Sequence, residues 1–438
     1  MSRKIIAIIC AGSLMGLVAC TQEAENAIFK SDRVLTEQQP TEPVNSKPVA
    51  TLSGYSLQEL MAFTVATSPR IRIARADFAS AGYDTDLIKT QNGTTVGLSG
   101  ELMTGSVSDN TISLDVGRTI SSFGRVAAEI EASQLSETVS ANRVDIAHLE
   151  TREQLIDYYF DWWVVSKTHE IRSRTTREAQ LILENIEKQS ELGILSSADK
   201  TSAGLQIDQL QRSLRAVKMD LTAALSDLSF FVGKDLDIDK LSRNLPKSKP
   251  SQRIKQSDIN SAISRDIRLL AFDVEREALS AKQRQISLSG RPTLRAVARM
   301  SLEEPFSSQQ EAQQGFGLGV NVPLNRGAQA EAKIGELSSQ LDRLEAQRTG
   351  REREIRMTMR IIQRSLEDYI TGTSALKSAR DRTIASLASN KRQFENGASD
   401  WRPYLSSINE VAQIDIEIAR IEIAAHAAAA RFDIIKND

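Results

Sequence analysis

The chain has 438 residues, and its 55 basic and 57 acidic side chains leave a formal net charge of −2. The two signs alternate along helical patterns and form no single-sign block, which argues against a nucleic-acid-binding surface. Only 5% of the residues are aromatic, few for one large globular core, and after the N-terminal segment no apolar run reaches the roughly 18 residues of a membrane-spanning helix.

The N-terminus has the pattern of a bacterial lipoprotein precursor. Residues 1–19 combine a basic start with an apolar stretch, and a lipobox ends at Cys20. Cys10 lies in the removed segment, so Cys20 would be the only cysteine of the mature chain and could form no internal disulfide. Diacylglyceryl attachment explains Cys20 better than the alternative, an ordinary signal peptide with a chance cysteine. Thr21, in place of an aspartate, resembles the outer-membrane sorting pattern of such lipoproteins.

The remaining chain divides into a tether and two copies of one unit. Residues 20–50 form a lipidated tether, because three prolines lie among Thr, Glu, Gln and Ser with few large apolar side chains. We place the first repeat at residues 51–232, an irregular connector at 233–257 and the second repeat at 258–438. Each repeat has the order helix, strand, strand, long helix, turn, helix.

Strand patterns precede each long helix. Large apolar residues alternate with small or polar ones from Phe316 to Val322, and the same alternation occurs at Ile112–Gly117. Further strands are expected at Thr94 and Thr293, which occupy matching places in the two repeats. Phe316, Leu318, Val320 and Val322 are predicted to face lipid, and Gly317, Gly319 and Asn321 are predicted to face a lumen.

Two very long helices follow the strands. No glycine or proline interrupts the stretch from Arg125 to about Gln189, which as one helix would be roughly 95 Å long. The second repeat predicts a similar helix from Ala328 to about Phe394. Such lengths favour a coiled coil or a tunnel over an ordinary globular domain. The first short helix should begin at a Ser56 capping box and break near Pro69.

The strands set a limit on assembly. Four strands of about 8 to 10 residues are long enough to cross a thin membrane when tilted, but four strands cannot close a barrel. An open sheet edge in lipid would leave backbone groups unpaired. The chain must therefore share strands with identical copies. Two copies would supply eight strands and three copies would supply twelve, and this arithmetic alone allows either.

No motif in the sequence predicts an enzyme, a cofactor or a metal site. The glycines at 315–319 resemble a dinucleotide loop, but they lie within a strand pattern and not between a strand and a helix. The three histidines fall on separate helical stretches without ligand spacing. Tyr158–Trp163 is the densest aromatic cluster, and packing between helices is the favoured interpretation over a ligand platform.

The ordered set of features resembles the TolC family of outer-membrane efflux proteins over essentially all of Leu52–Phe432. The resemblance rests on the element order, the twofold repeat, the strand exit Val322-Pro-Leu-Asn-Arg-Gly327, the lipobox and the glycine-marked helix turns. It implies a mainly α-helical fold with a membrane β-barrel contribution. Three copies would form a homotrimer with a twelve-stranded barrel in the outer membrane, continued into the periplasm by a helical tunnel. The exit Arg118–Gly124 departs from this pattern because it lacks the proline.

The resemblance also implies a closed tunnel end at two turns, Gly193–Asp199 and Gly397–Pro403. Asp199 matches the family's first-tip aspartate, whose arginine partner corresponds here to Ser399. The supporting tip tyrosine corresponds to Phe394, which lacks a hydroxyl. The aspartates that ring the constriction in the family correspond here to Pro403 and Ser406. The family's aspartate–arginine link is therefore absent as such, and the positions of its cation-selecting ring lack the aspartates.

Arg402 lies three residues beyond Ser399, and Asp400 can supply negative charge nearby. We hypothesise that Asp199 pairs with Arg402, on the same or a neighbouring subunit, as a substitute latch. The alternative is that both are solvated charges at the tip.

Two classes of function follow. The first is a passive outer-membrane exit duct for small molecules or secreted proteins, docked through a periplasmic adaptor to an inner-membrane pump or ABC transporter. The second is a periplasmic adaptor or structural coiled-coil lipoprotein without a channel. The two amphipathic β-hairpins favour the duct, and the paired lipoyl-type half-motifs of adaptors are not found. The sequence does not identify the cargo.

Replacing Cys20 with alanine should block acyl attachment, because the alanine side chain has no sulfur to accept a diacylglyceryl group. The precursor should then be processed slowly or reach the wrong location. Labelled palmitate measures the attachment, and its incorporation into the Cys20→Ala protein would contradict the lipobox interpretation.

Overall fold

The computed structural model describes residues 55–101, 111–241, 253–303, 311–323 and 327–437. All of them belong to one compact unit. The predicted signal peptide, the tether and Cys20 lie outside the described residues.

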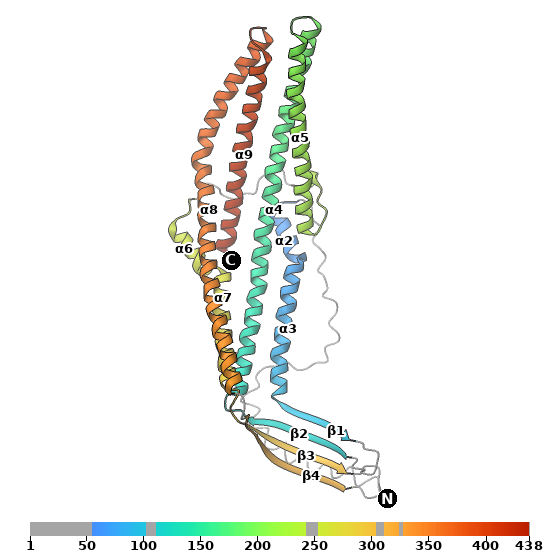
Figure 1. Cartoon of the computed structure of the whole chain (residues 1–438), viewed down its shortest axis with the longest axis vertical. Coiled ribbons are helices and arrows are strands. Elements are labelled where there is room, and N and C mark those ends of the chain that lie inside the picture. The colour runs from blue at the N-terminus through green and yellow to red at the C-terminus, as the bar shows by residue number, and fades with distance from the viewer. Residues whose placement is uncertain (1–54, 102–110, 242–252, 304–310, 324–326, 438) are drawn as a thin grey trace. The chain divides into compact units, whose positions relative to one another are not determined.

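The two halves of the chain contain matching elements (Figure 1). The first half comprises α2 (Leu57–Thr67), α3 (Pro69–Gln91), β1 (Thr94–Glu101), β2 (Thr111–Ser121), α4 (Arg125–Glu191) and α5 (Ser197–Val232). The second comprises α6 (Gln256–Arg265), α7 (Ile267–Ser287), β3 (Thr293–Glu303), β4 (Glu311–Asn321), α8 (Gly327–Glu395) and α9 (Trp401–Asn437). A 3₁₀ turn, Ile238–Lys240, lies between them. Each element recurs about 200 residues later, so the predicted internal repeat is present.

Each repeat begins with a short helix followed by a longer one, and local chemistry explains the break. Ser56 and Glu59 form the predicted capping box, in which the Ser56 hydroxyl accepts from the Glu59 N–H at 3.3 Å. Pro69 starts α3, where its missing N–H costs nothing. The second repeat makes the same break without proline. There the Asp266 carboxylate accepts from the Arg268 N–H at 2.9 Å and caps α7.

The long helices dominate the unit. α4 has 67 residues and α8 has 69, so each is roughly 100 Å long. α4 lies against α3, α5, α7 and α9, while α8 lies against α7 and α9 (Figure 1). Among the described residues, no helix has a stretch that is both apolar enough and long enough to cross a membrane.

The aromatic cluster on α4 packs between helices, as predicted. The side chains of Tyr159, Phe160, Trp162 and Trp163 are buried in a core with residues of α2, α5 and α9. Tyr158 is more exposed and stacks on Phe231 of α5, with ring centroids 4.9 Å apart. This core joins the start of the first repeat to the end of the second.

A buried ion cluster joins α4 to the α6–α7 corner. The Arg268 guanidinium donates to Asp266, with one contact of 2.6 Å, and to Glu153 on α4 at 2.9 Å. The Arg268 and Asp266 side chains are only 9% and 1% exposed. Burial raises the pKa of Glu153, and Arg268 opposes that rise. Because these charges are out of water, each depends on its partner.

Replacing Arg268 with methionine should lower the free energy of unfolding by about 3 to 5 kcal/mol, because it leaves the buried Asp266 carboxylate unpaired. Denaturant unfolding in detergent, followed by circular dichroism, would measure the loss. Arg284→Met is the matched control, since Arg284 also links α7 to α4, through Glu131 at 2.6 Å, but both side chains are more than half exposed. That change should cost under about 1 kcal/mol, and equal losses in the two variants would contradict the prediction.

Candidate functional site

The four strands form one antiparallel sheet in the order β1-β2-β3-β4 (Figure 1). The register places Val96, Val116, Ala298 and Phe316 in one row across the sheet. Directly opposed residues share a face, so this row and the alternation along each strand define two faces.

The even-numbered positions form an apolar face. Its large members include Val96, Leu98, Ile112, Leu114, Val116, Leu294, Met300, Leu302, Phe316, Leu318 and Val320. Phe316 is 74% exposed and Leu318 is 68% exposed. An apolar face of this extent, left uncovered by the residues that the structure describes, is typical of a surface that contacts lipid or another protein.

The odd-numbered positions form a polar face with many small side chains. They include Thr95, Gly97, Ser99, Ser113, Asp115, Gly117, Thr119, Arg295, Arg299, Ser301, Gln313, Gly315, Gly317, Gly319 and Asn321. The residues predicted for opposite faces of the last strand therefore do lie on opposite faces. Small residues suit the inner side of a curved sheet, where side chains crowd together.

The strand that carries these residues ends earlier than the sequence predicted. β4 ends at Asn321, so Val322 lies beyond the ladder. Pro323 follows and has no N–H to donate, which explains why pairing stops there. Val320 is consequently next to the end of the strand, whereas Phe316 lies at its middle.

The two helix turns at the other end of the long helices have the same backbone chemistry. Gly193 and Gly397 have positive φ angles of 72° and 69°. In each turn the following N–H bonds back five residues: Ile194 to the Gln189 carbonyl at 2.9 Å, and Ala398 to the Gln393 carbonyl at 2.8 Å. A left-handed glycine closing a helix in this way favours a tight, well-defined tip.

The Asp199 and Arg402 side chains meet across the two tips. Arg402 Nη2 lies 3.1 Å from Asp199 Oδ1 within the same chain, although the residues are 203 positions apart. Asp199 also accepts from the Ser196 hydroxyl at 2.7 Å. The Ser196 hydrogen bond and, to a lesser extent, Arg402 hold the pKa of Asp199 below its usual value. Asp199 is therefore an anion at neutral pH.

Arg402 lies in the first turn of α9, where the helix dipole disfavours a cation. Two carboxylates offset this, because Arg402 binds Asp400 as well as Asp199. Asp400 also accepts from the Trp401 N–H at 2.7 Å. The same carboxylate therefore caps the start of α9 and binds the Arg402 guanidinium. Ser399 takes no part in this contact, and its N–H bonds the Gln393 carbonyl.

A tryptophan that the sequence did not single out anchors the tips. Trp401 is fully buried among side chains of α4, α5, α8 and α9. Phe394, in place of the expected tyrosine, belongs to the same core and packs on Tyr404, with centroids 6.0 Å apart. The Arg402 guanidinium lies 4.9 Å from the centroid of the Trp401 ring. The sequence signal that could have identified Trp401 is a large aromatic residue four positions after the turn glycine Gly397, in a chain poor in aromatic residues.

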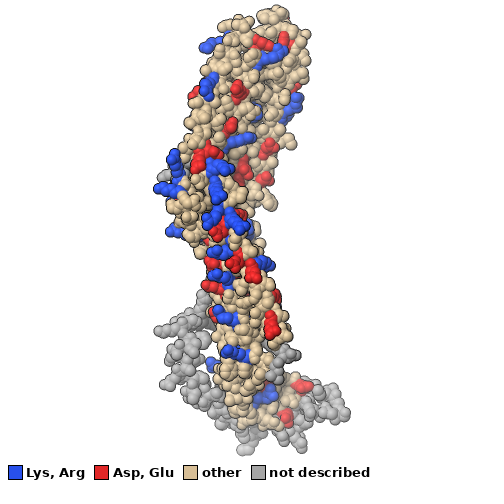
Figure 2. Space-filling model, turned by 60° about the vertical axis from the view of Figure 1, so that its left-hand side comes forward, with Lys and Arg blue, Asp and Glu red and all other residues tan. Residues whose placement is uncertain are grey.

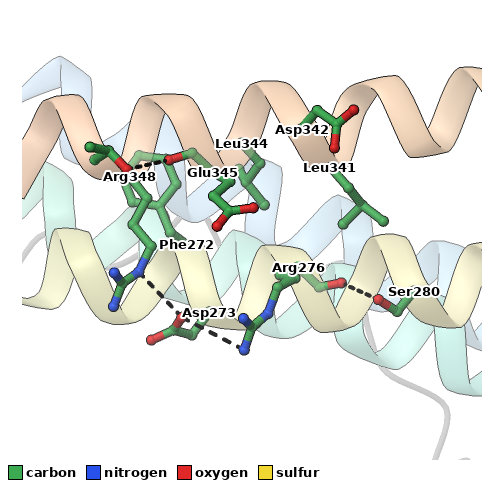
Figure 3. Close-up of a pocket in the computed structure, with 10 residues that line it drawn as sticks. Phe272, Asp273, Arg276, Ser280, Leu341, Asp342, Leu344, Glu345 and Arg348 are labelled. Carbon is green, nitrogen blue, oxygen red and sulfur yellow. Dashed lines mark hydrogen bonds and ion pairs between the residues drawn. The ribbon is translucent and has the colours of Figure 1, made fainter.

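A cleft of about 510 Å³ lies between α7 and α8 (Figure 3). Asp273 on α7 bridges it, since Arg348 of α8 lies 3.4 Å and Arg276 of α7 lies 4.0 Å from its Oδ1. Phe272 and Leu344 supply apolar lining. We interpret the cleft as packing between neighbouring helices, with Asp273 pairing the two arginines of its lining.

Charges elsewhere on the helices are mixed. Figure 2 shows basic and acidic side chains interspersed over the face in view, as the alternating sequence pattern predicted. Within the described ranges, no three His, Cys, Asp or Glu side chains come together in a metal-binding group.

Solved structures with this fold include several outer-membrane proteins. The outer membrane protein VceC from Vibrio cholerae matches with a TM-score of 0.73 and 12% identity, over 87% of this chain and 96% of that chain. A membrane protein from Pseudomonas aeruginosa matches with a TM-score of 0.70 and 16% identity, over 87% and 91%. The CmeC outer membrane channel of Campylobacter jejuni matches with a TM-score of 0.67 and 12% identity, over 87% and 85%.

No protein-family model and no curated protein sequence matches the chain. Structural matches at identities this low establish the fold alone, so the activity has to be argued from the site. The chain has the fold of the outer-membrane channel proteins, the fold that its resemblance to the TolC family implied.

Proposed function

We propose that the chain is one protomer of a homotrimeric outer-membrane channel that provides a passive exit for small molecules or secreted proteins. The observation that carries this proposal is the four-stranded sheet with one apolar and one polar face, attached to helices roughly 100 Å long. Such a sheet separates lipid from water only when it closes with copies of itself.

The strand lengths support a membrane role. β2, β3 and β4 each have 11 residues and β1 has 8, close to the 9 to 11 residues that a tilted membrane strand needs. β1 and β4 are the edge strands of the described sheet, so each can pair with the opposite edge of a neighbouring copy. Head-to-tail pairing of this kind produces a closed ring when the rotation between copies adds up to a full turn.

The remaining parts of the proposal come from the sequence and the resemblance. Cys20 would carry the lipid anchor, and the helices would extend into the periplasm of a Gram-negative cell. A periplasmic adaptor would join them to an inner-membrane pump or an ABC transporter of a type I secretion system. An adaptor or structural lipoprotein without a channel is the alternative, and the exposed apolar face of the sheet argues against it.

A lysine on the apolar face should impair assembly much more than a lysine on the polar face. Phe316 is at the middle of β4, so Phe316→Lys should cost about 2 to 4 kcal/mol if that point lies near mid-bilayer. Gly317→Lys is the matched control, because it adds the same charge one residue away on the other face, where an added Cβ would meet nothing within 4 Å.

Urea titration of folding into lipid vesicles would measure this difference. Equal stability of Phe316→Lys and Gly317→Lys would mean that neither face meets lipid and would favour the adaptor alternative. A larger loss in Gly317→Lys would reverse the assignment of the two faces.

We also propose that the Asp199–Arg402 contact holds the helical tips together and keeps the channel closed. Its location supports this, because it joins the turn between α4 and α5 to the turn between α8 and α9. Asp400 strengthens the arrangement by orienting the guanidinium. A single exposed ion pair is weak, but three related pairs acting together can bias a two-state gate.

Arg402→Ala and Asp199→Ala should each raise single-channel conductance in planar bilayers, and the double variant should add little. The pKa of Asp199 is lowered, so the contact should persist at neutral and mildly acidic pH and be lost only as the pH falls through that lowered value. Arg284→Ala removes another surface ion pair far from the tips and should leave conductance unchanged. Unchanged conductance in both tip variants would refute the latch.

A further inference from the structure

Arg295 on β3 is held in a fixed position across the polar face of the sheet. Its Nη2 donates to the Thr95 hydroxyl at 2.8 Å, although β2 lies between β3 and β1. The guanidinium crosses β2 at Gly117, where an added Cβ would be 2.8 Å from the same nitrogen. A side chain at position 117 would therefore displace the arginine. The glycine gives Arg295 a defined place.

The charge of Arg295 is not neutralised by the residues that the structure describes. Its bonding partner Thr95 is neutral. Arg299 lies on the same face, and its Nε donates to Asp115 at 2.5 Å. The opposite charges of Arg299 and Asp115 therefore cancel. Arg295 thus contributes a net positive charge near the ends of the strands that join the helices.

The opposite end of the same face is acidic. Glu101 and Glu303 both pair in register with Thr111, so they lie on either side of β2 at the loop end. Glu303 accepts from the Gln313 amide at 3.1 Å, a neutral partner. The polar face therefore carries positive charge at its helix end and negative charge at its loop end.

We propose that this face lines a lumen whose fixed charge reverses along its length, with Arg295 as the residue that attracts anionic solutes at the helix end. The proposal rests on the proposed channel, because three copies would bring three guanidinium groups around one aqueous passage. Low-dielectric walls concentrate the field of such groups on the solute. The solute class favoured at this position is small anions, such as carboxylates and phosphates.

Thiol modification of single-cysteine variants in lipid vesicles tests this. Val297 is on the polar face and pairs in register with Gly117, over which the Arg295 guanidinium lies, so the charge is about 5 to 7 Å away. A unit charge at that distance should favour an anionic over a cationic thiol reagent at Val297→Cys by about threefold at about 0.1 M salt. Adding Arg295→Gln should remove this preference. The chain without an introduced cysteine supplies the background rate.

Two matched variants sharpen the result. Arg118→Gln removes an exposed arginine from the apolar face, opposite Ala296 in register, and should leave the rate ratio at Val297→Cys unchanged. At the loop end, Glu303→Gln should raise the anionic-to-cationic ratio at Ser301→Cys, the opposite direction to Arg295→Gln.

Failure of the charge proposal and failure of the channel proposal give different results. Ala296→Cys on the apolar face should be protected by lipid while Val297→Cys reacts. If both react equally, or only Ala296→Cys reacts, the proposed channel wall is wrong. If only Val297→Cys reacts but its rate ratio is the same with Arg295→Gln, or shifts with Arg118→Gln instead, the channel stands and the role of Arg295 is overturned.

Discussion

Unpaired backbone groups at the two edges of a four-stranded sheet are the constraint on which this structure depends. β1 and β4 have no neighbour on their outer sides within the described chain, and one face of the sheet is apolar and uncovered. Unpaired edge groups are costly in lipid, and an exposed apolar face is costly in water. In the proposed channel, identical copies would pair the edges and lipid would cover the apolar face, so the fold and the assembly would be parts of one solution.

The helices solve a different problem, because a rod roughly 100 Å long cannot be held by one compact core. Several separate apolar clusters instead hold the helices together at successive points along α4, α5, α8 and α9. Ion pairs join the helices between these clusters. Asp415 of α9, only 11% exposed, binds Arg174 of α4 at 2.6 Å and Arg380 of α8 at 2.5 Å. This spacing of contacts explains a composition with few aromatic residues and many charges.

Most of the fold was predictable from local sequence signals. The strand alternation, the long stretches without glycine or proline, the turn glycines at 193 and 397 and the Ser56 cap all correspond to observed elements. These signals act over a few residues, which is why sequence analysis detects them. The end of β4 at Asn321 was missed because alternation continued through Val322 while the following proline stopped the ladder.

Long-range contacts were harder to predict. The proximity of Asp199 and Arg402 was a hypothesis drawn from the family resemblance, with Asp400 expected to supply charge nearby, and the structure places Arg402 against both carboxylates. Trp401 was missed because its burial requires four helices to converge at one point. The buried Arg268 cluster likewise combines a capping residue with a partner on a distant helix, and no sequence spacing reveals it.

The Asp199–Arg402 contact has a consequence for the order of events during biogenesis, because both partners belong to one chain. A link between subunits could form only after the ring had assembled. A link within one chain can form before any neighbour is present. With the latch proposed above, a channel built from such protomers would be shut when its sheet closes, so newly inserted pores would not make the outer membrane leak.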